Sequence, residues 1–128
     1  MTRQPVTTPD APSPIGPYSQ GIDAGQFLFC SGQVGLDPAT GRLAGGLEAQ
    51  VEQTLRNLGA VLRAAGLDYP DVVKTTIFLI DLDDFKAVNA VYARFFADAP
   101  PARSTFAVAG LPGGASVEIE AIAVRRTA

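Results

Sequence analysis

The fold is decided by the stretch Val72-Val73-Lys74-Thr75-Thr76-Ile77-Phe78-Leu79-Ile80, which is rich in β-branched and apolar residues. Alternation along a strand places Val73, Ile77 and Leu79 on one face and Val72, Phe78 and Ile80 on the other. Both faces are therefore apolar. A strand of this kind is covered on both sides, so we expect it in the centre of a β-sheet.

A helix is expected on each side of this strand in the sequence. Residues 46–65 carry apolar side chains at steps of three and four, and Gly66-Leu67 is typical of a helix C-terminal cap. After the strand, Asp81-Leu82-Asp83-Asp84 supplies capping side chains to a second helix that runs to about residue 97. Three carboxylates at a helix start are more simply explained as a cap than as a metal site.

Four more strands are expected, at residues 18–23, 26–34, 103–109 and 116–125. The segment Gly110-Leu111-Pro112-Gly113-Gly114 predicts a hairpin between the last two. Residues 1–13 are polar and proline-rich, which predicts an extended arm. The order of elements predicts a single α+β domain over residues 1–128, with both helices packed on one face of a mixed sheet. The other face then needs a partner.

The composition agrees with one domain that associates with other subunits. Hydrophobic residues make up 47% of the 128 residues and charged residues only 18%, so part of the surface must be apolar. The net charge of −3 and the pI of about 4.7 argue against a nucleic-acid partner. No apolar run is long enough for a membrane span and the N-terminus lacks a signal peptide, so we expect a soluble, cytoplasmic protein.

Histidine is absent, which excludes Ser-His-Asp and Cys-His nucleophile systems and the commonest transition-metal ligand. We therefore expect neither a metal nor another cofactor. Cys30 is the single cysteine and is expected in the core, facing away from any cleft. Lys74 has two interpretations: a desolvated amine for Schiff-base chemistry, or a side chain that reaches the sheet margin, which is the commoner outcome.

Several strings carry a family resemblance in their order and spacing. They are Ile15-Gly16-Pro17-Tyr18-Ser19-Gln20, Ser31-Gly32-Gln33, Asp81-Leu82-Asp83-Asp84-Phe85 with Val88-Asn89, Pro101-Ala102-Arg103-Ser104-Thr105, and Val117-Glu118-Ile119-Glu120-Ala121. Together they resemble the reactive intermediate deaminase (Rid, or YjgF) family over nearly the whole chain, from about residue 11 to residue 126. There are two modest departures: Pro100 stands where a large apolar residue is frequent, and Thr105 where cysteine is frequent.

The resemblance implies a chorismate-mutase-like fold and a homotrimer with three clefts between subunits. It also implies cofactor-independent hydrolysis of 2-enamine or 2-imine carboxylates, such as 2-aminoacrylate or 2-iminopropanoate, to 2-oxo acids and ammonia. The corresponding activity is that of a 2-iminobutanoate/2-iminopropanoate deaminase. The expected partners are then an imino or enamino acid substrate and further copies of the chain, with no nucleic acid and no membrane.

Arg103 is the central candidate of the site. A guanidinium binds a carboxylate through two parallel hydrogen bonds and stays charged, as a 2-imino acid requires; the alternative is a structural ion pair, for example with Glu120. The resemblance points to Glu118 as the general acid–base group, although a solvated charge or a partner for Arg103 are alternatives. We expect Glu118 and Glu120 on one face, approaching residues 103–107 across the hairpin, with Glu120 structural.

The remaining candidates are polar groups that the resemblance places near the cleft. Tyr18 follows a rigid Gly-Pro turn and is expected to bond substrate or water, although a single tyrosine is also a common packing residue. Ser31 and the backbone N–H of Gly32 are expected to bind the substrate, with a strand-end polar group as the alternative for Ser31. Asn89 lies mid-helix, where asparagine usually indicates a specific hydrogen bond, and Thr105 completes the binding residues.

Three functions remain open on these observations. The first is an imine or enamine hydrolase, and the second is a non-catalytic trimer that binds small carboxylate metabolites in the same clefts. Arg103 suits both, while Glu118 favours the enzyme. A ribonuclease, an activity attached to parts of the family, is disfavoured by the acidic pI and the lack of a basic aromatic groove.

Overall fold

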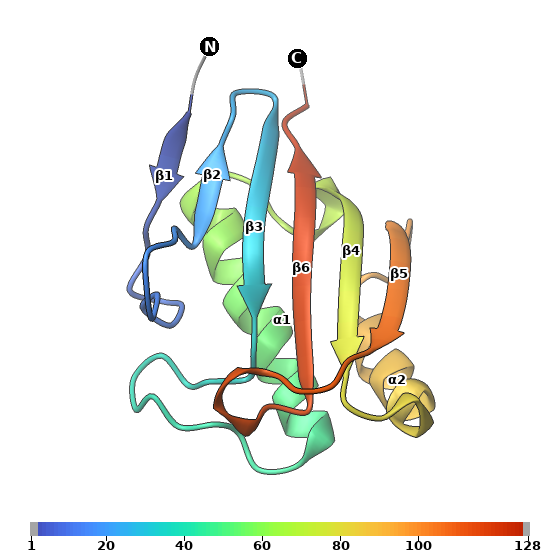
Figure 1. Ribbon diagram of the computed structural model, residues 1–128. Coiled ribbons are helices and arrows are strands. Elements are labelled where there is room, and N and C mark those ends of the chain that lie inside the picture. The colour runs from blue at the N-terminus through green and yellow to red at the C-terminus, as the bar shows by residue number, and fades with distance from the viewer. Residues whose placement is uncertain (1–2, 127–128) are drawn as a thin grey trace.

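The computed structural model describes residues 3–126 as one six-stranded sheet with two helices behind it (Figure 1). The strands are β1 (Gln4–Val6), β2 (Gly21–Asp23), β3 (Phe27–Gln33), β4 (Val72–Leu79), β5 (Ala102–Ala107) and β6 (Val117–Val124). The helices are α1 (Leu47–Ala64) and α2 (Phe85–Phe95), with short 3₁₀ turns at Tyr69–Asp71, Leu82–Asp84 and Pro112–Gly114. The predicted α+β class and the single mixed sheet are confirmed.

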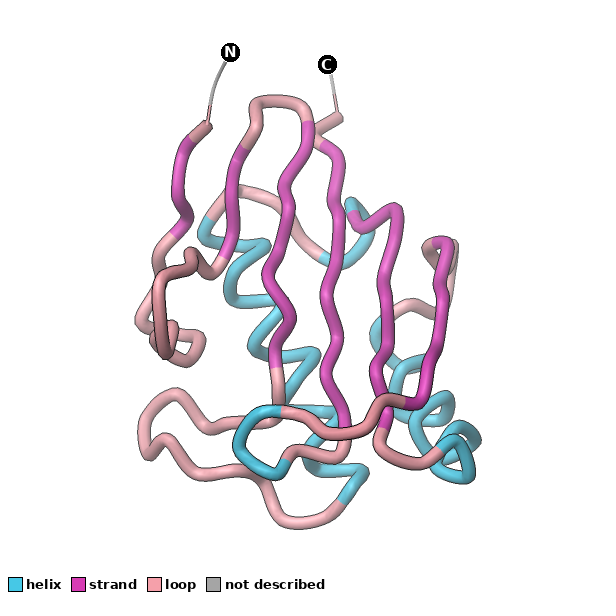
Figure 2. Tube along the Cα trace, in the orientation of Figure 1, coloured by secondary structure: helices cyan, strands magenta, loops and turns pink. Residues whose placement is uncertain are grey.

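The strands lie in the order β1-β2-β3-β6-β4-β5. Four of the neighbouring pairs are antiparallel, and β4 and β5 are parallel because α2 crosses over between them. The last strand of the chain is therefore in the middle of the sheet. Figure 2 shows the long loop that leads from β5 to β6 crossing the end of β4.

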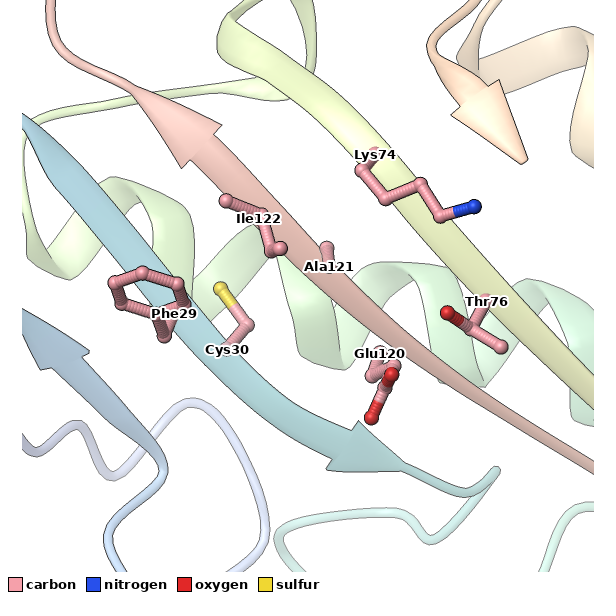
Figure 3. Close-up of a pocket in the computed structure, with 7 residues that line it drawn as sticks. All are labelled: Phe29, Cys30, Lys74, Thr76, Glu120, Ala121 and Ile122. Atoms are coloured by element: carbon pink, nitrogen blue, oxygen red, sulfur yellow. The ribbon is translucent and has the colours of Figure 1, made fainter. Parts of the chain in front are cut away.

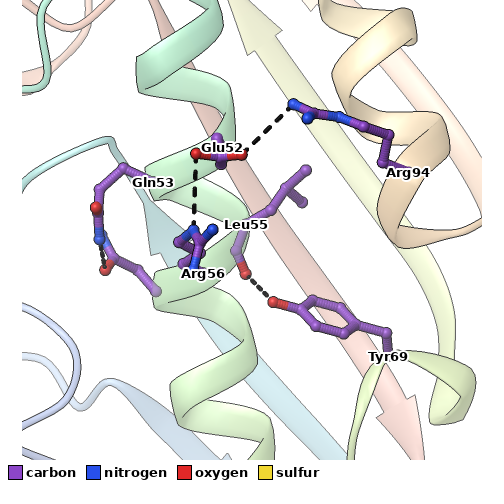
Figure 4. Close-up of polar contacts among 7 residues, drawn as sticks. Glu52, Gln53, Leu55, Arg56, Tyr69 and Arg94 are labelled. Carbon is purple, nitrogen blue, oxygen red and sulfur yellow. Dashed lines mark hydrogen bonds and ion pairs between the residues drawn. The ribbon is translucent and has the colours of Figure 1, made fainter.

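Both helices cover the same face of the sheet, as predicted, and the core lies between them and that face (Figure 1). The largest fully buried side chains are Leu28, Leu55, Leu58, Leu62, Ile77, Leu79 and Ile119. Helix α1 ends at the predicted cap, where Gly66 has φ +79° and the Leu67 N–H donates to the Leu62 carbonyl at 2.9 Å. In Figure 4, Glu52 of α1 lies 3.5 Å from Arg94 of α2, an exposed ion pair that links the helices.

A second contact in Figure 4 ties the turn before β4 to the helical layer. The Tyr69 hydroxyl donates to the Leu55 carbonyl at 2.6 Å. Burial of that hydroxyl raises the pKa of Tyr69, with smaller opposing effects from Arg63. Tyr69 therefore has a structural role, which is to connect the turn before β4 to α1.

The predicted hairpin between the last two strands is wrong. β5 pairs only with β4, and β6 lies on the other side of β4, so that one strand separates them. Residues 108–116 step over the end of β4, where the Val108 N–H donates to the Leu79 carbonyl and the Ile80 N–H to the Ser116 carbonyl. A Gly-Pro-rich segment reverses the chain direction, but it does not require that the strands on either side of it pair.

The two faces of β4 also differ from the prediction at its first residues. The register of β4 against β6 shifts between Val72 and Lys74. Val72 is 5% exposed and lies on the same side as Ile77 and Leu79, whereas Val73 is 42% exposed and lies on the opposite side. The prediction had placed Val73, and not Val72, with Ile77 and Leu79. From Thr75 onward, alternate residues face the helices as simple alternation requires, with Thr75, Ile77 and Leu79 buried. The opposite, open face carries Lys74, Thr76 and Phe78.

No covering layer lies on the open face of the sheet among residues 3–126. Phe27, Phe29 and Phe106 are between 43% and 53% exposed, and Phe78 stacks on Phe106 with ring centroids 6.5 Å apart. Beside Phe29 is a shallow hollow of about 210 Å³, which Lys74 of β4 and Glu120 of β6 also line (Figure 3). An apolar face of this kind, with a few charges, is typical of a surface that another protein chain covers.

Within the predicted N-terminal arm, Gln4–Val6 forms an edge strand that the prediction missed, and the chain turns at residues 9–11. β1 pairs antiparallel with β2. The following residues are fixed by Gln20, which is 2% exposed: its Oε1 accepts from the Thr8 N–H at 2.7 Å and its Nε2 donates to the Pro12 carbonyl at 2.9 Å. The arm is thereby held beside the end of β2.

Asn57 fixes the loop after β3, and this leads to a first prediction. The side chain is fully buried, and its Nδ2 donates to the carbonyls of Val34 and Leu36 at 3.0 and 2.9 Å. We expect Asn57→Ala to lower the free energy of unfolding by about 1–3 kcal/mol, because a buried side chain is truncated and two partly buried carbonyls each lose a donor. Urea unfolding measures this, with Gln53→Ala as the control, since Gln53 bonds only the Asn57 Oδ1. Equal stability of the two variants would contradict the prediction.

Candidate functional site

Four of the predicted site residues lie together at the end of β3. Tyr18, Ser31, Gly32 and Glu118 line a cavity of about 660 Å³. β3 and β6 are neighbours, but their register breaks between Cys30 and Gln33, so Ser31 and Gly32 lie in the irregular part of the strand. The rest of the wall is Pro12, Ser13, Ile15, Gln33, Val34, Leu36, Pro112, Gly113 and Glu120.

Tyr18 is presented to this cavity by a tight turn. Gly16 has φ +118°, a backbone conformation that favours glycine, and the Tyr18 N–H donates to the Gly16 carbonyl at 3.0 Å. The side chain is 51% exposed, and its hydroxyl oxygen accepts from the Ile15 N–H at 3.3 Å. This bond orients the hydroxyl and leaves its proton available for a ligand.

Ser31 and Gly32 contribute in different ways. The Ser31 hydroxyl donates to the Ser19 carbonyl at 2.5 Å, so its oxygen remains as an acceptor toward the cavity. Gly32 lies directly against the Glu118 side chain: a Cβ atom at position 32 would be 2.2 Å from the Glu118 Oε2. The carboxylate therefore occupies the space that any other residue at position 32 would fill.

Of the two carboxyl groups that line this cavity, Glu118 is the more buried and Glu120 is exposed. The pKa of Glu118 is raised above the usual value of 4.5, first by desolvation and then by the negative charge of Glu120 two residues along β6. A carboxyl group whose pKa is raised holds a proton more readily than an ordinary carboxyl group, which suits a general acid–base role.

The other predicted residues lie at a different place, between β5 and α2. Arg103 and Asn89 line a hollow of about 460 Å³ together with Tyr92, Ala93, Phe96, Ala97 and Pro100. The Arg103 guanidinium carbon lies 4.9 Å from the ring centroid of Tyr92 and 5.4 Å from that of Phe85. Within residues 3–126, no carboxylate is close enough for an ion pair with Arg103, and no hydrogen bond of its side chain is formed.

Thr105 follows Arg103 two residues later on the same face of β5. Its hydroxyl is buried and has no hydrogen-bond partner among the described residues. A buried polar atom without a partner is uncommon in a folded protein and marks a place where a partner is expected to bind. Thr105 does not line the hollow of Arg103 and Asn89, and the hydroxyl of Thr54 on α1 is likewise buried without a partner among the described residues.

The two groups do not meet within one chain. Arg103 is in register with Thr75 on the helix side of the sheet, whereas Glu118 and Glu120 lie on β6, beyond β4 and on the open face. The expected approach of Glu118 across the hairpin is therefore wrong. The alternative ion pair between Arg103 and Glu120 is likewise not formed in the described chain.

The remaining candidates from the sequence have structural roles. The Lys74 Nζ donates to the Ser104 hydroxyl at 2.8 Å on the open face. Cys30 is buried in the core, and desolvation raises the pKa of its thiol to about 12. Asp81 accepts from the Asp83 N–H at 2.9 Å and so caps the 3₁₀ turn before α2, whereas α2 itself has no side-chain cap at Asp84. No cluster of acidic, cysteine or histidine side chains suited to a metal ion occurs within residues 3–126.

Phe85 and Tyr92 are site residues that the sequence did not identify. Their spacing along α2 matches an apolar stripe, which predicts burial against the sheet. The signal that distinguishes them is Asn89, which lies on the same helix face between the two aromatic residues. A polar residue within an apolar stripe indicates that the stripe faces a ligand site as well as the core.

Comparison with known proteins identifies the family of this chain. Residues 8–125 match the family described as Endoribonuclease L-PSP. A mouse protein named 2-iminobutanoate/2-iminopropanoate deaminase is 49% identical over 126 residues, which is 98% of this chain and 93% of the mouse protein. The chain belongs to the Rid (YjgF) family. Deaminase function is thereby supported at the level of the family.

Solved structures of Rid proteins have the same fold. The YjgF gene product of Escherichia coli has a TM-score of 0.93 at 48% identity, covering 96% of this chain and 99% of that chain. Escherichia coli TdcF, solved with bound serine, has a TM-score of 0.94 at 43% identity, with 96% and 99% covered. Within residues 3–126, neither helix is both long enough and apolar enough to cross a membrane.

The contact between Gly32 and Glu118 leads to a second prediction. In Gly32→Ala the new methyl group displaces the flexible end of Glu118, so we expect the free energy of unfolding to change by less than about 1 kcal/mol. We expect turnover of an imino acid to fall roughly 100-fold, because the carboxylate of the candidate residue Glu118 is displaced. Gly45→Ala is the control, since no atom lies within 4 Å of its added Cβ. Unchanged kcat in Gly32→Ala would contradict this role for Glu118.

A third prediction concerns pH. Because Glu120 raises the pKa of Glu118, Glu120→Gln should lower it, and the limb of the kcat/KM profile that reports Glu118 should move to lower pH. The folded state also holds the Glu118 proton more tightly than the unfolded chain. Its contribution to stability is therefore full below the unfolded pKa and is lost as pH rises through the folded pKa. Glu48→Gln removes an equal charge from the exposed start of α1 and should leave both profiles in place.

Proposed function

We propose that the protein hydrolyses 2-imino and 2-enamino carboxylates to 2-oxo acids and ammonia, at clefts shared between the subunits of a homotrimer. The observation that carries this proposal is Arg103, a partly buried cation with no ion-pair partner among the described residues. Such a cation, in one hollow with Asn89 and two positions before Thr105 on β5, fits the carboxylate of a small substrate. The names of the mouse, human and plant relatives support the same reaction.

The reaction assigns the other group of residues to the C=N end of the substrate. A water oxygen bonds to the imine carbon while the C=N electron pair moves to nitrogen, which takes a proton. The resulting carbinolamine then loses ammonia as its C–N bond breaks and the C=O bond forms. Glu118, with its raised pKa, takes the proton of water and returns one to nitrogen, and the Tyr18 hydroxyl orients the water or the leaving amine. No step requires a metal or another cofactor.

The separation of the two groups is what supports the shared cleft. Arg103 lies at the β5 edge on the helix side, and Glu118 lies on β6 beyond β4, so one chain cannot place both on one small molecule. The open face presents exposed phenylalanines that need a cover. Packing of that face against further copies of the chain covers them and brings the β5 edge of one subunit toward the Glu118 cavity of the next. We expect this trimer to act in the cytoplasm.

The main alternative is a trimer that binds small carboxylates without turnover. It uses Arg103 in the same way but gives no role to the raised pKa of Glu118. Cleavage of RNA, which the family description names, is not favoured by a chain with net charge −3.

The fourth prediction tests both the reaction and the shared cleft. We expect Arg103→Ala to lower imine turnover by roughly 30- to 4,000-fold and to abolish 2-oxo acid binding, since a desolvated charge-assisted pair is lost. Glu118→Gln should lower kcat but keep 2-oxo acid binding. When the two variants are unfolded together and refolded at equal amounts, each mixed trimer contains one intact cleft. Activity should then return to about a quarter of the wild-type value, because about three quarters of the trimers are mixed.

The controls of this experiment separate its outcomes. Each variant refolded alone should keep only its own low turnover, and light scattering should report a trimer for every sample. Mixing the two folded variants without unfolding them should restore no activity as long as their trimers do not exchange subunits. A monomer, or mixed samples no more active than the separate variants, would overturn the shared cleft. Wild-type protein that binds a 2-oxo acid but does not accelerate imine decay would support the binding protein instead.

A further inference from the structure

Two aromatic rings surround the charged end of Arg103. Phe85 and Tyr92 lie on the same face of α2, two turns apart, and their ring centroids are 5.4 and 4.9 Å from the guanidinium carbon. Both distances are within the range at which a ring face attracts a cation. The positive charge is therefore stabilised by rings and not by a carboxylate of the described chain.

Tyr92 is itself held in place by a contact with the sheet. Its ring is almost fully buried, and its hydroxyl shares a hydrogen bond of 2.7 Å with the hydroxyl of Thr75, which is completely buried on β4. Thr75 is in parallel register with Arg103, so the residue that fixes the ring and the residue that the ring holds lie side by side in the sheet. β4 thus fixes Tyr92 through Thr75 and also pairs with the strand that carries Arg103.

A ring contact differs from an ion pair in what it leaves free. A guanidinium has five N–H donors, and a carboxylate partner would occupy two of them. A ring face attracts the delocalised charge of the guanidinium but does not occupy its N–H donors as a carboxylate oxygen does. Among the described residues no hydrogen bond of the Arg103 side chain is formed, so its donors remain available.

We propose that Phe85 and Tyr92 form an aromatic clamp, two rings that position the Arg103 guanidinium so that its N–H groups face the substrate carboxylate. Phe85 and Tyr92 are positioning residues in this proposal, which rests on the proposed function because it assumes that Arg103 binds that carboxylate. The clamp increases the affinity for 2-imino and 2-oxo acids by holding Arg103 in one orientation before the ligand arrives.

Phe85 is the better of the two rings to test, because it is 39% exposed and its replacement leaves the core intact. We expect Phe85→Leu to weaken the binding of 2-oxobutanoate roughly three- to tenfold, and Phe85→Tyr, which keeps the ring, to retain wild-type affinity within about twofold. Phe95→Leu is the matched control. It removes a phenylalanine from the same helix whose ring contacts Tyr69 and not Arg103, and it should leave binding unchanged.

A double-mutant cycle decides whether Phe85 acts through Arg103. The kcat/KM of Phe85→Leu should fall in the wild-type background but not in the Arg103→Ala background, where there is no guanidinium to hold. The residual turnover of Arg103→Ala is measured at high enzyme concentration. An equal loss in both backgrounds would mean that Phe85 contacts the substrate directly, and it would overturn the clamp.

The failures of the two proposals are distinguishable. If Arg103→Ala binds 2-oxobutanoate as the wild type does, the proposed function fails at its central residue. If Arg103→Ala loses binding while Phe85→Leu and Phe85→Tyr both keep it, the proposed function stands and the clamp fails.

Discussion

The pairing of β6 between β3 and β4 is the constraint on which the rest of the structure depends. It places Glu118 next to the irregular end of β3, where the missing side chain of Gly32 makes room for its carboxylate. It also leaves β5 at the sheet edge, attached only through β4, so that Arg103 faces α2. The long loop from β5 to β6 is the consequence of this pairing. The two halves of the candidate site are therefore separated by the same strand order that builds the sheet.

Local features of the fold were predictable from the sequence because the signals for them are local. The stripe on α1, the Gly66 cap and the Asp81 cap each depend on residues a few positions apart, and all three are present. Strand pairing between distant segments has no such signal. The Gly-Pro-rich loop at residues 110–114 predicted a hairpin, yet β6 gains two antiparallel neighbours in the sheet interior instead of one at the edge. The bulge at Val73 likewise arises from pairing with β6 and inverts the first two residues of β4.

The candidate site was predictable as a set of residues but not as an arrangement. The resemblance supplied Tyr18, Ser31, Gly32 and Glu118, and the structure brings them to one cavity. Gly32 was expected only as a backbone donor, and its role as space for a carboxylate needs the three-dimensional contact. Phe85 and Tyr92 were hidden, because a ring that faces both the core and a cation has the same helical spacing as a core residue.

Separation of the opposite charges explains why both remain available for chemistry. An arginine and a carboxylate within 4 Å in one partly buried cleft would pair, and the pair would occupy the donors that a substrate carboxylate needs. Pairing would also lower the pKa of the carboxyl group, whereas the pKa of Glu118 is raised. In this chain Arg103 is stabilised by aromatic rings, and Glu118 lies in a desolvated cavity on the other face of the sheet. In the proposed trimer the two groups come together with room for a substrate between them, so that the substrate carboxylate, and not Glu118, takes the Arg103 donors.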